Sequence, residues 1–153
     1  MKRTGLMVTV VAALGLAGLA HAADEPENNV KYRQNLMKAV GGHMGAISGV
    51  VKGEVTYGPH VVEHARAINA MSRVVGDVFV TGTDHTKVKG SRAKAEIWQN
   101  TAEWQKVVQG FQTASANLVK AAEGNDKDAV AENFAALGQS CGACHKPFRA
   151  EQQ

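Results

Sequence analysis

Apolar side chains recur at steps of three and four residues along most of the chain, and this spacing limits the fold more than any other feature of the sequence. A helix places such residues on one face, whereas a half-buried strand places them at every second position. No segment alternates convincingly with a period of two. Four segments have the helical spacing: about 27–52, about 60–78, about 93–123, and a last one from a cap at Asn125 or Asp126 to Phe148. Each is expected to form an amphipathic helix.

The connections between these segments predict how the helices are arranged. Gly53 and Gly124 are placed to end the first and third helices, and most connections are short. Short connections favour antiparallel neighbours. The loop that contains Gly82, Asp84 and Gly90 is longer than usual, which suits it to wrap or cap something. The expected fold class is therefore all-α, an antiparallel four-helix bundle.

The first 22 residues have the composition of an export signal. Two basic residues precede an apolar stretch from Leu6 to Leu19, and Ala20-His21-Ala22 has the small-x-small pattern of a cleavage site. The apolar stretch is short for a transmembrane span, although an uncleaved anchor helix is the alternative. We expect residues 1–22 to be a signal peptide and residues 23–153 to form one exported domain that is not inserted in the membrane.

The charge balance argues against two classes of partner. The chain has 17 Lys and Arg residues and 14 Asp and Glu residues, a formal charge of +3. The signal peptide contains two of the basic residues and no acidic residue, so the mature chain has a formal charge of +1. No cluster of basic residues stands out. Nucleic acid and anionic membranes are therefore not expected partners.

Both cysteines of the sequence belong to one motif in the fourth predicted helix, Cys141-Gly-Ala-Cys144-His145. Positions i, i+3 and i+4 of a helix share one face, so both thiols and the imidazole point the same way. This is the attachment signature of c-type haem, in which the thiols form thioethers with the vinyl groups and the His binds iron as proximal ligand. We expect one haem c per chain, covalently attached through Cys141 and Cys144, with His145 as axial ligand.

Three other interpretations of the motif explain less of the sequence. A thioredoxin-like pair would lie beside a strand in a βαβ pattern, which the sequence does not contain. A structural zinc site normally needs four protein ligands, and only scattered histidines remain outside the motif. A disulfide suits an exported protein but leaves the adjacent His145 unexplained. Only 5% of the residues are aromatic, which agrees with a large apolar ligand bound in the bundle near the C-terminus.

Four groups of residues together resemble a known family: Cys141-Gly-Ala-Cys144-His145-x-x-Phe148-Arg149, Tyr32-Arg33-Gln34, Gly82-Thr83-Asp84 and Ile97-Trp98. The family is the class II cytochromes c, which comprise cytochrome c′ and its low-spin relative cytochrome c556. The likeness covers nearly all of the mature chain. It implies a four-helix bundle, often a homodimer through its first two helices, that works in the periplasm with redox partner proteins or small gases.

The resemblance also implies roles for single residues. Arg33 and Gln34 match residues that interact with the haem propionates, and Arg149 matches a basic residue near the proximal His. Met37 matches the distal position that faces the iron. Arg33 and Met37 are one helical turn apart, so a cation near the propionates and a thioether over the ring can share one face.

The sequence leaves the role of Met37 open. No Met or His follows His145, so a sixth iron ligand has to come from upstream. If Met37 does not bind the iron, the site is five-coordinate, as in cytochrome c′, and can bind NO or CO; the Gly82-Thr83-Asp84 loop favours this state. If Met37 binds, the protein is a low-spin electron carrier of the c556 type. Met37 as simple core filler is the third possibility.

An enzymatic role is not expected. A peroxidase or a reductase-type haem protein would need an acid–base group such as His or Arg where Met37 stands. Among the other histidines, His43 is expected to be solvated or dimer-facing, and His60 and His64 to form a surface pair one turn apart. Pro147 departs from the family pattern and is expected to bend the last turn.

Overall fold

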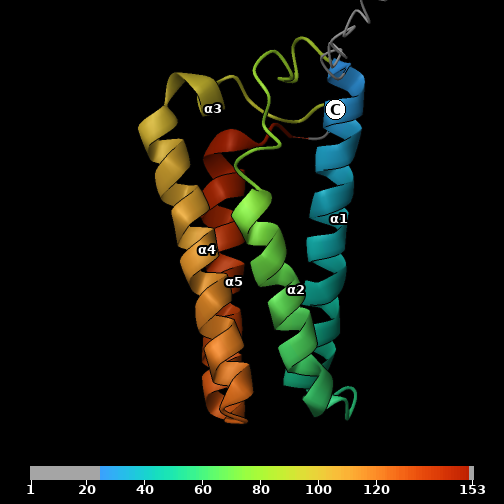
Figure 1. Cartoon of the computed structure of the whole chain (residues 1–153), viewed down its shortest axis with the longest axis vertical. Coiled ribbons are helices and arrows are strands. Elements are labelled where there is room, and N and C mark those ends of the chain that lie inside the picture. The colour runs from blue at the N-terminus through green and yellow to red at the C-terminus, as the bar shows by residue number, and fades with distance from the viewer. Residues whose placement is uncertain (1–24, 152–153) are drawn as a thin grey trace, which may run out of the picture.

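A computed structural model describes residues 25–151, so the predicted signal peptide at 1–22 lies outside the described residues. Four long helices run antiparallel to their neighbours in the chain and form one bundle (Figure 1). Their bounds are α1 Pro26–Val51, α2 Val61–Val74, α4 Thr101–Glu123 and α5 Lys127–Phe148, with a short 3-10 helix η1 at Gly58–His60 and a short helix α3 at Glu96–Gln99. The predicted all-α four-helix bundle is confirmed.

Two of the predicted helices differ from the observed ones. The second predicted helix, 60–78, ends earlier, because α2 stops at Val74 and the chain turns into the long loop. The third, 93–123, is broken at Asn100, whose φ of −113° and ψ of 57° leave the helical region between α3 and α4. Asn is a weak helix former that readily takes up other backbone conformations. The break at Asn100 changes the direction of the chain between α3 and α4.

Each long helix contributes one fully buried aliphatic residue to the centre of the bundle. Ile47 of α1, Ile68 of α2, Leu118 of α4 and Leu137 of α5 all have 0% exposure and belong to one cluster. All four occupy the apolar stripes that the sequence predicts. Fully burying side chains of this size stabilises the fold by about 1.5–3 kcal/mol each relative to leaving them exposed.

The helices do not pack equally. α4 lies firmly against α5 and α2, whereas α1 packs on α2 and touches α5 only weakly. This unequal packing leaves room between α1 and the α4–α5 pair. Among residues 25–151, no helix is both long and apolar enough to cross a membrane.

The buried guanidinium of Arg33 holds the long loop against α1. One of its terminal nitrogens donates a hydrogen bond to Thr83 Oγ1 at 2.9 Å, and the other donates to Thr83 O and Ser91 Oγ at 3.0 Å each. Its central carbon lies 4.8 Å from the centroid of the Phe79 ring. Gly82 and Gly90 have φ values of +86° and +83°, in the left-handed region that glycine tolerates. The loop therefore closes over one end of the bundle (Figure 1).

Replacement of Arg33 by Ala is expected to lower the free energy of unfolding of the holoprotein by about 2–3 kcal/mol, because it leaves buried loop acceptors without their charged donor. Chemical denaturation followed by circular dichroism measures this. Lys31→Ala, which changes an exposed residue of the same helix, is the control and should have almost no effect. Equal losses in the two variants would contradict the assignment of Arg33 as the loop's anchor.

Candidate haem site

A cavity of about 620 Å³ lies between α1, α4 and α5, at the end of the bundle that the long loop closes. Its volume falls within the range of roughly 300–1,000 Å³ that is usual for ligand pockets. Met37, Val40 and Met44 line it from α1, and Phe79 and Ile97 line it from the loop and α3. The walls are thus mainly apolar and suit a ligand with a large apolar surface.

Aromatic rings form one side of this cavity. Trp104 of α4 stands edge-on to Phe79, with ring centroids 4.5 Å apart, and edge-on to Phe148 of α5 at 5.4 Å. The indole nitrogen of the neighbouring Trp98 donates a hydrogen bond to Phe79 O at 3.0 Å, which fixes that part of the loop. Four of the eight aromatic residues of the chain line the cavity, and the edge-to-face contacts among three of them stabilise its wall.

The predicted attachment residues lie together on the wall that α5 forms. Cys141, Cys144 and His145 all line the cavity and are half-buried. The two cysteines do not pair with each other in a disulfide, and Cys141 Sγ donates a hydrogen bond to Leu137 O at 3.4 Å. The shared face follows from their i, i+3, i+4 spacing on an unbroken helix.

Burial sets the protonation state of these three groups. It raises the pKa of Cys144 to about 11, with the neighbouring Cys141 adding to the shift, and it raises the pKa of Cys141. Burial also lowers the pKa of His145, and the positive charges of Arg149 and Arg92 lower it further. Before the haem is attached, the chain at neutral pH therefore presents two uncharged thiols and a neutral imidazole. A neutral imidazole is the form that binds iron.

Two glycines leave space in opposite parts of the cavity lining. Gly41 of α1 and Gly138 of α5 both line it, and a Cβ atom built on either would meet nothing within 4 Å. A larger side chain at either position would project into the open space rather than pack against the protein. The cavity, its apolar walls and its donor set therefore fit a flat haem c.

The other predicted site residues have different roles in the geometry. Met37 lines the cavity from α1, as predicted from its place one turn after Arg33. Arg33 also lines it, but its guanidinium nitrogens are bound by the loop. Gln34 Nε2 donates to Gly90 O at 2.7 Å. Arg33 and Gln34 of α1 therefore both hold the loop through direct hydrogen bonds.

Arg92 is a site residue that the sequence analysis did not identify. It lines the cavity together with Arg149, and its Nε donates to Ala150 O at 2.9 Å. The sequence feature that could have indicated a role for Arg92 is its position in the long loop, directly before the predicted start of the third helix. Only the tertiary fold brings residue 92 beside the end of α5.

Pro147 does not break α5, which continues to Phe148. Backbone hydrogen bonds join the end of the helix to the segment around Ala93: Lys94 N donates to Phe148 O at 2.9 Å and Ala150 N donates to Arg92 O at 2.8 Å. Arg149 N also donates to His145 O at 3.1 Å. These bonds fix the backbone at Arg149, so the proline is tolerated one residue before the helix ends.

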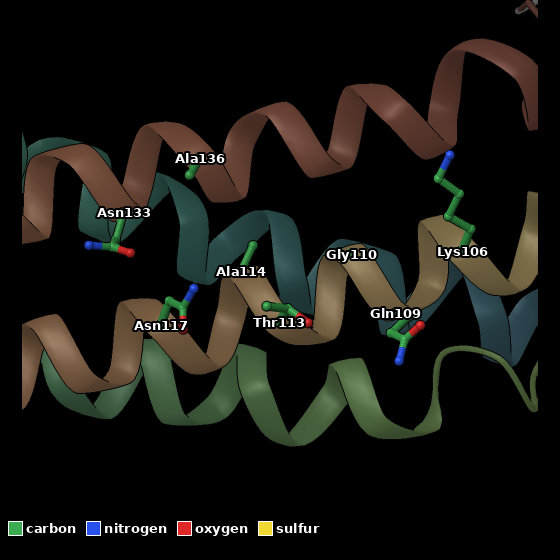
Figure 2. A pocket seen from close by; sticks show the side chains of 8 residues that line it. All are labelled: Lys106, Gln109, Gly110, Thr113, Ala114, Asn117, Asn133 and Ala136. Atoms are coloured by element: carbon green, nitrogen blue, oxygen red, sulfur yellow. The ribbon is translucent and has the colours of Figure 1, made fainter.

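A second hollow lies between α4 and α5, away from the attachment motif (Figure 2). Its volume is about 400 Å³, and five of its eight lining residues are polar: Lys106, Gln109, Thr113, Asn117 and Asn133. The sticks in Figure 2 show amide and hydroxyl groups along two facing helices. None of these side chains is a usual ligand of haem iron, so this hollow is not a second haem site.

The family model described as cytochrome c′ matches residues 28–149. Cytochrome c′ of Rhodospirillum rubrum is 34% identical over 151 residues, which cover 99% of this chain and 100% of that protein. Cytochrome c-556 of Agrobacterium fabrum is 30% identical over 142 residues, which cover 92% of this chain and 94% of that protein. A ferrous variant of cytochrome c prime from Alcaligenes xylosoxidans with bound NO is 30% identical and has a TM-score of 0.77, covering 86% of this chain and 100% of that chain.

The matched region begins at the third residue of α1 and extends one residue beyond α5. It therefore includes α2, α4 and α5 in full, all but the first two residues of α1, the loop and every residue of the attachment motif. The resemblance seen in the sequence is confirmed. The chain belongs to the cytochrome c′ family, the class II cytochromes c, and carries one haem c attached through its two cysteines, Cys141 and Cys144.

Proposed function

We propose that the chain is a periplasmic mono-haem cytochrome of the cytochrome c′ type, which binds NO or CO at a five-coordinate iron, transfers single electrons, and is not an enzyme. One observation carries the proposal. Two thiols and a neutral imidazole share one wall of an apolar cavity, and the wall formed by α1 presents two Met thioethers, at Met37 and Met44, as possible iron ligands. When bound, haem c supplies an iron that changes oxidation state and takes up a small ligand.

In this proposal His145 is the proximal iron ligand. Burial and the nearby arginines keep its imidazole neutral, so a ring nitrogen is available to the metal. Cys141 and Cys144 hold the ring from the same helix and fix its orientation relative to His145. Pairing of the helix end with the segment around Ala93 keeps the last turn of α5 in register with the cavity.

The cations at the cavity suit the two propionates of a haem. The charged residues that line it are Arg33, Lys38, Arg92 and Arg149, and no Asp or Glu is among the described lining residues. Charge-assisted hydrogen bonds to carboxylates are the strongest kind these side chains make. Arg92 and Arg149 are the best placed, since the loop already occupies the guanidinium of Arg33. Arg33 and Gln34 would then act mainly by holding the loop.

The apolar α1 wall favours uncharged gases over chemistry that needs proton transfer. Met37, Val40, Gly41 and Met44 offer no acid–base group there; the cations that α1 adds to the lining are Lys38 and Arg33, and the loop holds the guanidinium of Arg33. The relative with bound NO supports gas binding. The relative named cytochrome c-556 supports the alternative, a low-spin electron carrier with Met37 as sixth ligand. A haem enzyme of the peroxidase or reductase type is disfavoured by the same wall.

Absorption spectra of the ferric and ferrous protein, with and without CO, separate the two states of the iron. We expect a high-spin ferric spectrum and ready CO binding by the ferrous form. Met37→Ala should leave the ferric spectrum unchanged, as should Met71→Ala, a control whose side chain does not line the cavity. A sulfur-to-iron charge-transfer band that is present in the wild type and lost only in Met37→Ala would support the c556 alternative instead.

Replacement of Gly138 by Leu should reduce the haem content per chain well below one, because the new side chain fills space in the cavity. The matched control is Gly110→Leu, since Gly110 is also an exposed helical glycine with nothing within 4 Å of a built Cβ, but lines the polar hollow of Figure 2. Both changes favour the helix by about 0.8 kcal/mol. Haem content is measured by pyridine haemochrome absorbance, and equal content in the two variants would contradict the haem position.

Export is tested by N-terminal sequencing of the protein from a periplasmic extract. We expect the sequence to start at Ala23, since Ala20-His21-Ala22 has the pattern of a cleavage site. Replacement of Ala22 by Asp should block cleavage, because the cleavage site requires a small residue. Wild-type protein that retains Met1 or stays in the cytoplasm would contradict the proposed location.

A further inference from the structure

Two histidines meet on the surface between α1 and α2, away from the haem cavity. The Nδ1 atoms of His43 and His64 lie 2.8 Å apart, and their ring centroids are separated by 5.1 Å. The sequence analysis expected His64 to pair with His60 instead. The structure corrects this, because the exposed His60 stacks on Tyr57 with ring centroids 5.2 Å apart and the rings nearly parallel.

The contact between the two Nδ1 atoms needs something between them. Two neutral nitrogens can approach this closely only if one of them donates a proton or if both lone pairs bind a cation. Both rings are half-buried. Burial lowers the pKa of His64, and the charges of His43 and His60 lower it further. His64 is therefore neutral at pH 7, which is the form that binds a metal.

The spacing suits two neighbouring ligands of one metal ion. Metal–nitrogen bonds of about 2.0–2.1 Å put two nitrogens about 2.9 Å apart when the angle at the metal is 90°, and about 3.3 Å apart when it is tetrahedral. The observed 2.8 Å is close to the first value. Ligands at right angles are typical of Cu²⁺, which also binds such nitrogens most tightly among the divalent first-row ions.

We propose that His43 and His64 form a binding site for a Cu²⁺ ion that bridges α1 and α2. Each ring binds through Nδ1 and keeps its proton on Nε2. No group of three or more His, Cys, Asp or Glu side chains arranged to hold a metal occurs among residues 25–151, so water completes the coordination. The site does not depend on the proposed haem function, because neither histidine lines the haem cavity.

Titration of the ferric holoprotein with Cu²⁺ by calorimetry at pH 7.5 tests the proposal, with a preparation that has no histidine tag. We expect one ion per chain. His43→Gln and His64→Gln should each weaken binding by about 100-fold, the usual advantage of two linked ligands over one. The metal should also raise the melting temperature of the wild type, since it binds only the folded arrangement of the two helices.

Two control variants keep the test specific to this pair. His60→Gln and His85→Gln should bind Cu²⁺ as the wild type does, because His60 stacks on Tyr57 and His85 contacts Ala93 O. Circular dichroism and the haem spectrum verify that all four variants are folded. Absence of Cu²⁺ binding, or a loss of binding in His60→Gln but not in His43→Gln, would overturn the proposal.

Discussion

The site depends on the incomplete closure of the bundle beside α1. α1 packs on α2 but touches α5 only weakly, so the apolar residues of α1, α4 and α5 face one another across open space. Gly41 and Gly138 line that space without side chains, and a Cβ built on either meets nothing within 4 Å. Protein interiors are normally packed as densely as organic crystals, and unfilled apolar space is costly. The haem therefore completes the hydrophobic core as well as supplying the iron.

The buried guanidinium of Arg33 has a structural role, because it holds the loop that closes the cavity end of the bundle. Arg33 is only 4% exposed and satisfies its donors with Thr83, Ser91 and Val78 of the loop. A buried charge of this kind is tolerated only when it is fully hydrogen-bonded. Because Gln34 also bonds to Gly90, two consecutive residues of α1 hold the loop beside the cavity. α1 thus supplies an apolar wall of the cavity and also the hydrogen bonds that hold the loop over that cavity.

The sequence predicts the parts of this structure that depend on local spacing. Ile47, Ile68, Leu118 and Leu137 recur at helical intervals, so their burial at the bundle centre follows from periodicity alone. The common face of the attachment motif follows from the same geometry. Met37 also lines the cavity where the helical spacing from Arg33 indicates.

The features that the sequence does not predict depend on contacts between distant segments. The break at Asn100 and the early end of α2 arise where the chain enters or leaves the long loop. The partners of Arg33 lie 45 or more residues away along the chain, and Arg92 contacts Ala150, which lies 58 residues away just after α5. His43 and His64 pair because α1 and α2 are neighbours, whereas spacing within one helix favours His60 and His64. A long side chain takes whichever partner the tertiary fold supplies.

The raised pKa values of the two thiols bear on how readily they are oxidised before the haem is attached. Disulfide exchange and oxidation proceed through the thiolate, and a thiol with a pKa of about 11, as at Cys144, is almost entirely protonated at neutral pH. Cys141 is also shifted towards the protonated form. In a folded chain without haem, burial would therefore keep both thiols mostly protonated and slow their oxidation before they add to the vinyl groups of the cofactor.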